Sequence, residues 1–208
     1  MSRTHRIRQW VSGPALLLFA LILAHPAKSA TIDQHGGTVT LSGEILSTSA
    51  ELFVNEFARA MLAAPRNEPV VITLNSPGGD ARAAHRIADQ IHSARHHGMK
   101  VETRVERGGM CMSACPLIFS AGEDRLVSSR SLFLFHGVVY QGPRATAQIV
   151  DALNAEKRAY LDRMRSVDPD LGNFLDRRRI VAENIEAEFD GASLRDIFPG
   201  FVTGMLAE

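Results

Sequence analysis

The segment VVITLNSPGGD at residues 70–80 decides which fold the rest of the chain must fit. Its first part, Val70 to Leu74, is a short, continuous apolar run, which is typical of a strand covered on both faces in a parallel sheet. Its second part, Asn75 to Asp80, has the composition of a tight turn. Apolar residues then recur at helical spacing as far as Gly98, at Ala84, Ile87, Ala88 and Ile91. The segment therefore predicts a strand, a turn and a helix in succession.

The same alternation continues on both sides of this segment. Before it, residues 37–45 alternate as a strand, and a helix follows to Ala64, with capping-box spacing at Thr48 and Glu51. After it we expect strands at 101–105 and 131–136, helices at 114–121 and 145–164, a charged helical stretch after Asp168, and an apolar segment at 197–205. Strands that alternate with helices predict an α/β fold with a mainly parallel sheet covered on both sides.

The first thirty residues have the pattern of an export signal. Three arginines and no acid lie in the first eight residues, and an apolar stretch of eleven residues, Pro14–Ala24, follows. This stretch is shorter than the about 20 residues that span a bilayer. Ala27-Lys28-Ser29 then offers small residues to a signal peptidase. We therefore predict a signal peptide at 1–29, a domain at 30–208 that begins at Ala30 or Thr31, and a periplasmic or secreted location. A retained N-terminal membrane anchor is the alternative.

The charge balance and the histidine pattern narrow the classes of ligand that the chain is expected to bind. From residue 30 onwards the chain has 19 basic and 23 acidic residues, a net charge of −4. This balance argues against a nucleic-acid surface and gives no electrostatic reason to bind anionic lipid. His92, His96 and His97 include one pair at i, i+4, but no third ligand is evident. A solvated helix end explains these histidines better than a metal site, and no metal is expected.

Three features with catalytic chemistry fall where predicted strands end. The turn at Pro77–Gly79 precedes a helix, so its backbone N–H groups can bind an oxyanion. Pro116 places the start of the next helix near Met112 to Ser113, and a serine at a strand-to-helix turn can act as a nucleophile. His136 ends a strand and can act as a general base. Each feature alone also fits a structural role, but their order in one domain favours a catalytic site.

These features together carry a resemblance to a known family. From residue 37 through Asn-Ser-Pro-Gly-Gly, then Ser113, His136 and Val139-Tyr140-Gln141-Gly142 before a long helix, the chain resembles the proteolytic subunit of Clp protease. That family consists of serine peptidases of the crotonase-like superfamily. The resemblance implies a repeated ββα spiral with a protruding handle helix. It also implies Ser113 as nucleophile, His136 as base, and the N–H groups of Gly79 and Ala114 as oxyanion donors.

The third member of the triad departs from the family pattern. Counting back without gaps from Gly200-Phe201-Val202, which resembles the family's closing Gly-Leu-Val, places the family's aspartate on Glu188. Glu186 and Asp190 have the same strand parity and are alternatives, as is a solvated acidic stretch without a catalytic role. A serine–lysine dyad is disfavoured, because none of the three lysines is well placed for Ser113.

Cys111 and Cys115 are the only cysteines, and they flank Ser113. An even count in an exported protein favours a disulfide, and four residues are within bridging reach if the turn is tight. Two buried thiols fit the spacing equally well.

The resemblance predicts a serine endopeptidase that hydrolyses short or unfolded peptides outside the cytoplasm. It implies a homo-oligomer, in ring or trimer form, and requires no cofactor. The family's ATP-dependent unfoldase is not expected as a partner where nucleotide is lacking, and a membrane is expected only through a retained anchor. One alternative is an inactive binding or scaffold protein of the same fold. A crotonase acting on acyl-coenzyme A is less favoured, because of the export signal and because no acidic pair lies near the turns.

Overall fold

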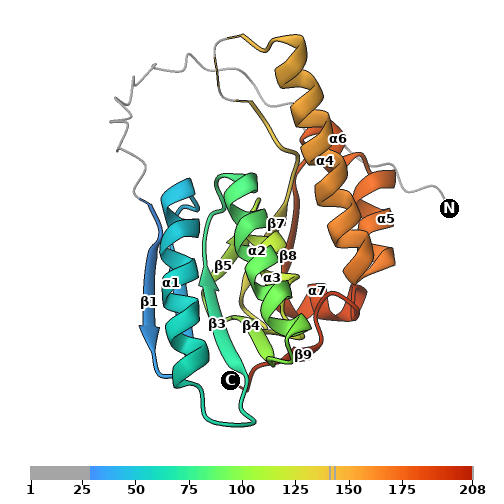
Figure 1. Cartoon of the computed structure of the whole chain (residues 1–208). Helices are drawn as coiled ribbons and strands as arrows, with labels where there is room; N and C mark the ends of the chain where they lie inside the picture. Colours follow the sequence, from blue (N-terminus) through green and yellow to red (C-terminus); the bar gives the residue numbers. More distant parts are fainter. Residues whose placement is uncertain (1–28, 141, 143, 208) are drawn as a thin grey trace, which may run out of the picture.

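A six-stranded sheet forms the centre of the computed structural model, which describes residues 29–140, 142 and 144–207 (Figure 1). The strand order is β1-β2-β3-β4-β6-β9. β1 and β2 are antiparallel, and all the other pairs are parallel. The strands are β1 (Thr31–His35), β2 (Thr38–Ser42), β3 (Val70–Asn75), β4 (Val101–Val105), β6 (Asp124–Val127) and β9 (Gly204–Met205). Residues 1–28 of the predicted signal peptide and Gln141 lie outside the described residues.

A second sheet has the order β5-β7-β8 and consists of β5 (Met110–Met112), β7 (Leu132–Phe135) and β8 (Ala187–Asp190). Ser76, the residue directly after β3, joins the two sheets. Its N–H donates to the carbonyl of Met110 at 2.7 Å, and its own carbonyl accepts from the N–H of Met112 at 3.0 Å. The turn after β3 is thereby held beside the end of β5.

Seven helices lie in the described part of the chain: α1 (Ser47–Ala63), α2 (Ala81–His96), α3 (Cys115–Phe119), α4 (Ala147–Val167), α5 (Pro169–Arg177), α6 (Ile180–Glu183) and α7 (Gly191–Ile197). In Figure 1, α1 and α2 lie side by side on the six-stranded sheet, whereas α4 extends away from the sheets with α5 beside it. This arrangement confirms the predicted α/β fold, its mainly parallel sheet and the protruding handle helix.

Local boundaries differ from the sequence predictions. The strand predicted from residue 37 is the shorter β2, and the antiparallel β1 precedes it. The capping box at Thr48 and Glu51 is wrong, because α1 begins at Ser47 and the Ser49 hydroxyl instead accepts from the Leu46 N–H at 3.0 Å. β5, β6, β8 and β9 have two to four residues each, which is too short for a periodic pattern to show.

A cluster of phenylalanine rings fixes the end of β7. Phe135 packs on Phe201 with ring centroids 5.8 Å apart, and Phe119 of α3 packs on Phe133 at 5.1 Å. All four side chains are fully buried. Burial of each is worth about 1.5–3 kcal/mol relative to exposure. Because His136 directly follows Phe135, this packing also places the histidine.

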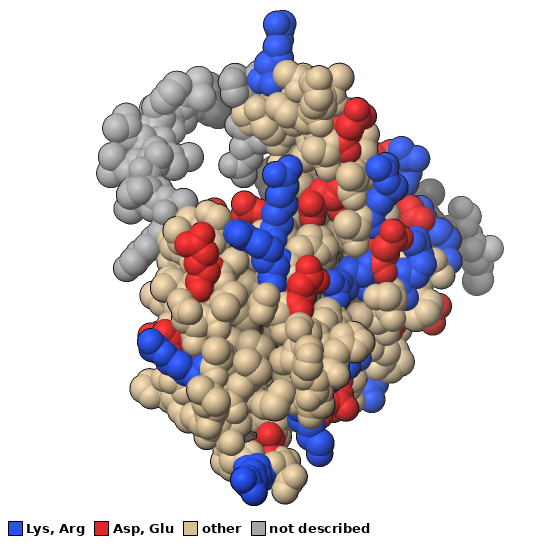
Figure 2. All heavy atoms as spheres, in the orientation of Figure 1, with Lys and Arg blue, Asp and Glu red and all other residues tan. Residues whose placement is uncertain are grey.

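The surface carries charges of both signs. On the face shown in Figure 2, Lys and Arg side chains are interspersed with Asp and Glu.

Within residues 29–140, 142 and 144–207, no helix is long and apolar enough to cross a membrane. In the same part of the chain, no group of three or more His, Cys, Asp or Glu side chains is placed to hold a metal ion.

Candidate active site

Ser113 lies in a sharp turn between β5 and α3. Its backbone has a φ of 59°, in the left-handed region that residues with a Cβ seldom adopt. Its N–H donates to the carbonyl of Leu134 in β7 at 2.8 Å, and its carbonyl accepts from the Tyr160 hydroxyl at 3.1 Å. The helix begins at Cys115, two residues later than the predicted limit at Ser113, with Pro116 within its first turn. The serine is thus in the turn and not in the helix.

Gly78 and Gly79 pack against this turn without room for a side chain. A Cβ on Gly78 would lie 2.5 Å from the Cβ of Ser113, and a Cβ on Gly79 would lie 2.2 Å from the carbonyl oxygen of Ile45. Both glycines have positive φ, 96° and 139°. Glycine therefore allows the backbone to approach the serine this closely.

Two backbone N–H groups are left without partners beside Ser113. The N–H of Gly78 donates to the Ser76 hydroxyl at 3.0 Å. The N–H groups of Gly79 and Ala114, in contrast, have no hydrogen-bond partner among the described residues. These are the two groups predicted as oxyanion donors, and their residues line the same cavity as Ser113.

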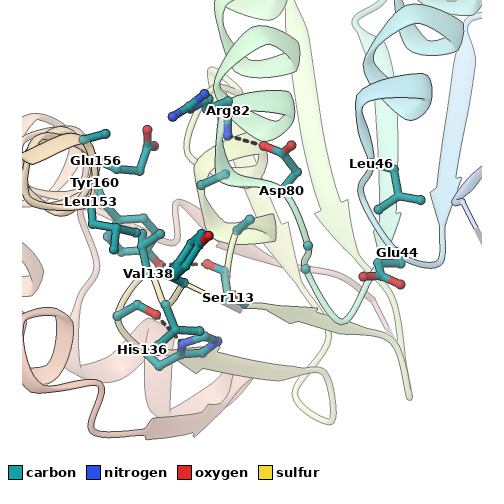
Figure 3. Close-up of a pocket in the computed structure, with 18 of the residues that line it drawn as sticks. Glu44, Leu46, Asp80, Arg82, Ser113, His136, Val138, Leu153, Glu156 and Tyr160 are labelled. Atoms are coloured by element: carbon teal, nitrogen blue, oxygen red, sulfur yellow. Dashed lines mark hydrogen bonds between the residues drawn. The ribbon is translucent and has the colours of Figure 1, made fainter. Parts of the chain in front are cut away.

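The predicted catalytic residues line one cavity of about 860 Å³ (Figure 3). Gly79, Ser113, Ala114 and His136 all contribute to its wall. Apolar side chains of the wall come from Leu46, Val138, Val139, Ile149 and Leu153. The structure therefore brings four of the five predicted catalytic residues together from distant parts of the sequence.

The contacts of His136 define its tautomer. Its Nδ1 lies 2.7 Å from the carbonyl oxygen of Gly137 and 3.0 Å from Oδ1 of Asn184. A backbone carbonyl can only accept, so Nδ1 carries the proton in the neutral ring. Nε2 is then the basic nitrogen. Among the described residues, the hydrogen bonds of the His136 ring go to Gly137 and Asn184 and none goes to the Ser113 hydroxyl; such bonds are often long when no substrate is bound.

Asn184 lies beside Nδ1 of His136, where the third member of the triad was expected to be an acid. It follows α6 with a φ of 54°, and asparagine tolerates this left-handed conformation better than most residues. Its Oδ1 faces the Nδ1 side of His136. The sequence offered one signal, an asparagine after a short apolar run, but nothing in that signal points to the histidine 48 residues earlier.

The predicted acids lie elsewhere. Glu188 is paired with Leu134 across the two strands and lines a second cavity together with Glu186. Asp190 caps α7, and the Ser193 N–H that its carboxylate accepts at 2.7 Å lowers the pKa of Asp190. The chain passes His136 at Asn184, before β8 begins. Counting back from the C-terminus without gaps therefore reached the strand instead of the preceding turn.

Cys111 and Cys115 form a disulfide across the serine turn, as one of the two sequence alternatives predicted. Both cysteines are fully buried. The bond joins the end strand β5 to the first residue of α3, so that Ser113 lies in the middle of a closed loop.

Three side chains of helix α4 make contacts in and around the site, and none of them was predicted as a site residue. Tyr160 is almost completely buried, and this burial raises its pKa far above the ordinary tyrosine value. One turn earlier, Oε1 of Glu156 lies 2.9 Å from Nε2 of His85 in α2. Lys157 donates to the carbonyl of Ala182 at 2.9 Å, close to Asn184 in sequence. One face of α4 thus contacts α2, the serine turn and the segment that holds Asn184.

The fold and this cavity define an α/β protein with a serine at a strand-to-helix turn and a histidine beside it. Residues 31–164 match the family model of Clp protease, and the chain belongs to that family. Among solved structures, it is similar to an asparagine-to-aspartate mutant of ClpP1 from Listeria monocytogenes, with a TM-score of 0.64 and 18% identity. That match covers 83% of this chain and 92% of the other, and it shows the same fold. A search of curated proteins found no significant match.

The packing of Gly78 on Ser113 gives a test of the site's architecture. Gly78→Ala should lower the free energy of unfolding by about 3 kcal/mol, because the new methyl group meets backbone atoms and φ is positive. Gly36→Ala is the matched control, since Gly36 has a φ of 55° but no atom within 4 Å of its added Cβ. The control should lose about 1 kcal/mol. Urea unfolding followed by circular dichroism measures both, and equal losses would contradict the close packing.

Proposed function

We propose that the chain is a serine peptidase in which Ser113 is the nucleophile, His136 the general base and Asn184 the residue that orients the histidine. The observation that carries the proposal is the left-handed turn at Ser113, with two unpartnered N–H groups beside it and His136 in the same cavity. Membership of the Clp protease family supports a peptidase. A strand-to-helix turn of this kind exposes a serine hydroxyl to substrate.

In the first half of the reaction, the Ser113 Oγ attacks the carbonyl carbon of a peptide bond, and Nε2 of His136 takes the hydroxyl proton. The carbonyl oxygen becomes an oxyanion, which the N–H groups of Gly79 and Ala114 stabilise. Each such donor is worth about 3 kcal/mol in the transition state. When the tetrahedral intermediate collapses, the C–N bond breaks and His136 gives the proton to the leaving amine. The acyl group stays on Ser113.

In the second half, a water molecule attacks the acyl carbon while His136 takes one of its protons. The same two N–H groups stabilise the second oxyanion. The bond between the acyl carbon and Ser113 Oγ then breaks, and His136 returns the proton to the serine. The Nδ1 contacts with Gly137 and Asn184 hold the imidazole in the tautomer that this cycle needs.

Substrate, location and assembly complete the proposal. The apolar side chains of the cavity wall suit short or unfolded peptides. The basic, apolar and small-residue pattern of residues 1–29 supports a periplasmic or secreted location. Family membership supports a homo-oligomer, and no cofactor is required by the chemistry above.

An inactive scaffold of the same fold is the second candidate. An asparagine beside His136, where the resemblance predicts an acid, favours it. The two candidates differ in one measurable property, the hydrolysis of peptides.

Ser113 and His136 should act as one unit. Ser113→Ala and His136→Ala should each lower kcat for an unstructured fluorogenic peptide at least about a thousandfold, because neither group works without the other. The double variant should be scarcely slower than either single variant. Thermal unfolding of Ser113→Ala should keep the wild-type midpoint. Full activity in Ser113→Ala would rule out the proposed nucleophile, and a folded but inactive wild-type protein would leave the scaffold.

Asn184 should matter more than the predicted acid. Asn184→Gly removes the side chain while tolerating positive φ, and it should lower kcat about tenfold through the loss of one hydrogen bond to the histidine. Asn184→Asp should raise kcat about tenfold, because a carboxylate stabilises the protonated imidazole better than an amide does. Glu188→Gln is the control and should keep wild-type activity. Activity that falls in Glu188→Gln but not in Asn184→Gly would reverse the assignment.

The exported protein should begin at Ala30. Ala30 is 3% exposed, and its nitrogen donates to the carbonyl of Glu44 at 2.7 Å, so removal of this residue would open the core. N-terminal sequencing of protein recovered from the native host tests this. Intact Met1 in soluble cytoplasm would contradict the export proposal.

A further inference from the structure

The Tyr160 hydroxyl contacts the same peptide group that supplies one of the proposed oxyanion donors. It donates to the carbonyl oxygen of Ser113 at 3.1 Å. That carbonyl and the N–H of Ala114 belong to one peptide unit. A peptide unit is planar and trans, so the C=O and the N–H point in opposite directions. Fixing the oxygen therefore fixes the direction of the N–H.

The surroundings keep the hydroxyl in this role. Tyr160 is 2% exposed, and Ser113 is the hydrogen-bond partner of its hydroxyl among the described residues. Because burial raises its pKa well above the ordinary value, the side chain stays a neutral hydroxyl that can donate. Lys157 donates to the carbonyl of Ala182 and holds α4 beside the segment that contains Asn184, and Glu156 of α4 lies against His85 of α2. The position of the hydroxyl is thus fixed by the body of the protein.

We propose that Tyr160 is a positioning residue, which orients and polarises the peptide between Ser113 and Ala114 so that the Ala114 N–H binds the oxyanion. Hydrogen bonds in a chain strengthen one another, and a donor at the carbonyl makes the N–H of the same amide a better donor. The role rests on the proposed peptidase function. Tyr160 acts through the Ala114 N–H and does not itself touch the reacting atoms. The proposal gives the handle helix a direct connection to the chemistry.

Transition-state binding separates this role from a structural one. Tyr160→Phe should lower kcat for a fluorogenic peptide about tenfold, because one oxyanion donor is weakened but not removed, while KM changes less than about twofold. A peptide boronate forms a tetrahedral adduct with the serine and uses the same donors. Its inhibition constant should rise by the same factor as kcat/KM falls. The affinity of an uncleaved peptide, measured in the Ser113→Ala background, should stay unchanged.

Thr103→Val is the matched control. The Thr103 hydroxyl is also buried and also donates to a main-chain carbonyl, that of Phe119 at 2.7 Å, but it does not line the cavity. Loss of this hydrogen bond should lower the thermal midpoint and leave kcat and boronate affinity at wild-type values. If both variants change kcat and boronate affinity equally, the effect of Tyr160 is structural and the proposal is wrong.

A second variant keeps the test decisive if Tyr160→Phe does not fold. Tyr160→4-aminophenylalanine keeps a donor of the same shape in place and should retain kcat within about threefold of wild type, since a neutral N–H donates nearly as well. If the 4-aminophenylalanine variant folds but its kcat falls to the level expected for Tyr160→Phe, the proposed role is wrong. Wild-type protein that neither hydrolyses peptide nor binds the boronate would instead overturn the proposed function. Active wild-type protein with an unaffected Tyr160→Phe would overturn this inference alone.

Discussion

Ser113 adopts a backbone conformation that costs a residue with a Cβ about 1–3 kcal/mol, and the surrounding structure holds it there. The disulfide between Cys111 and Cys115 closes the turn covalently, because it joins the residues on both sides of Ser113. The Leu134 carbonyl fixes the serine N–H, and Gly78 packs on its Cβ. Ser113 lines the cavity in this conformation, and the N–H of the next residue, Ala114, has no partner among the described residues.

The remaining parts of the site follow from how the two sheets meet. Ser76 pairs with β5 directly after β3, so the glycine turn has to end beside Ser113. The pairing of β5 with β7 brings the strand that ends before His136 alongside the serine. Helix α4 contributes another part of the cavity wall, and there the Tyr160 hydroxyl donates to the Ser113 carbonyl. The glycine turn, the serine turn, the residues after β7 and helix α4 thereby all contribute to one cavity.

The sequence predicted the fold and most of the residues that share the candidate site's cavity, because those features depend on local patterns. The buried run at Val70–Leu74, the glycine turn and the strand-end histidine are all visible in short windows. Asn184 was missed because its contact with His136 depends on where the turn between α6 and β8 lies relative to β7, which no local pattern encodes. Tyr160 resembles any buried residue of an amphipathic helix until its contact with Ser113 is known. The choice between a disulfide and two thiols needed the geometry of the turn.

The central claim is that His136 activates the hydroxyl of Ser113 as a nucleophile. Labelling with a fluorophosphonate tests this claim most directly. The reagent forms a covalent bond with an activated serine and places its phosphoryl oxygen between the oxyanion donors. Peptide mass spectrometry should find the adduct on Ser113 in the wild-type protein, and neither Ser113→Ala nor His136→Ala should be labelled. A folded wild-type protein that stays unlabelled, or a Ser113→Ala variant labelled as fast as wild type, would contradict the account.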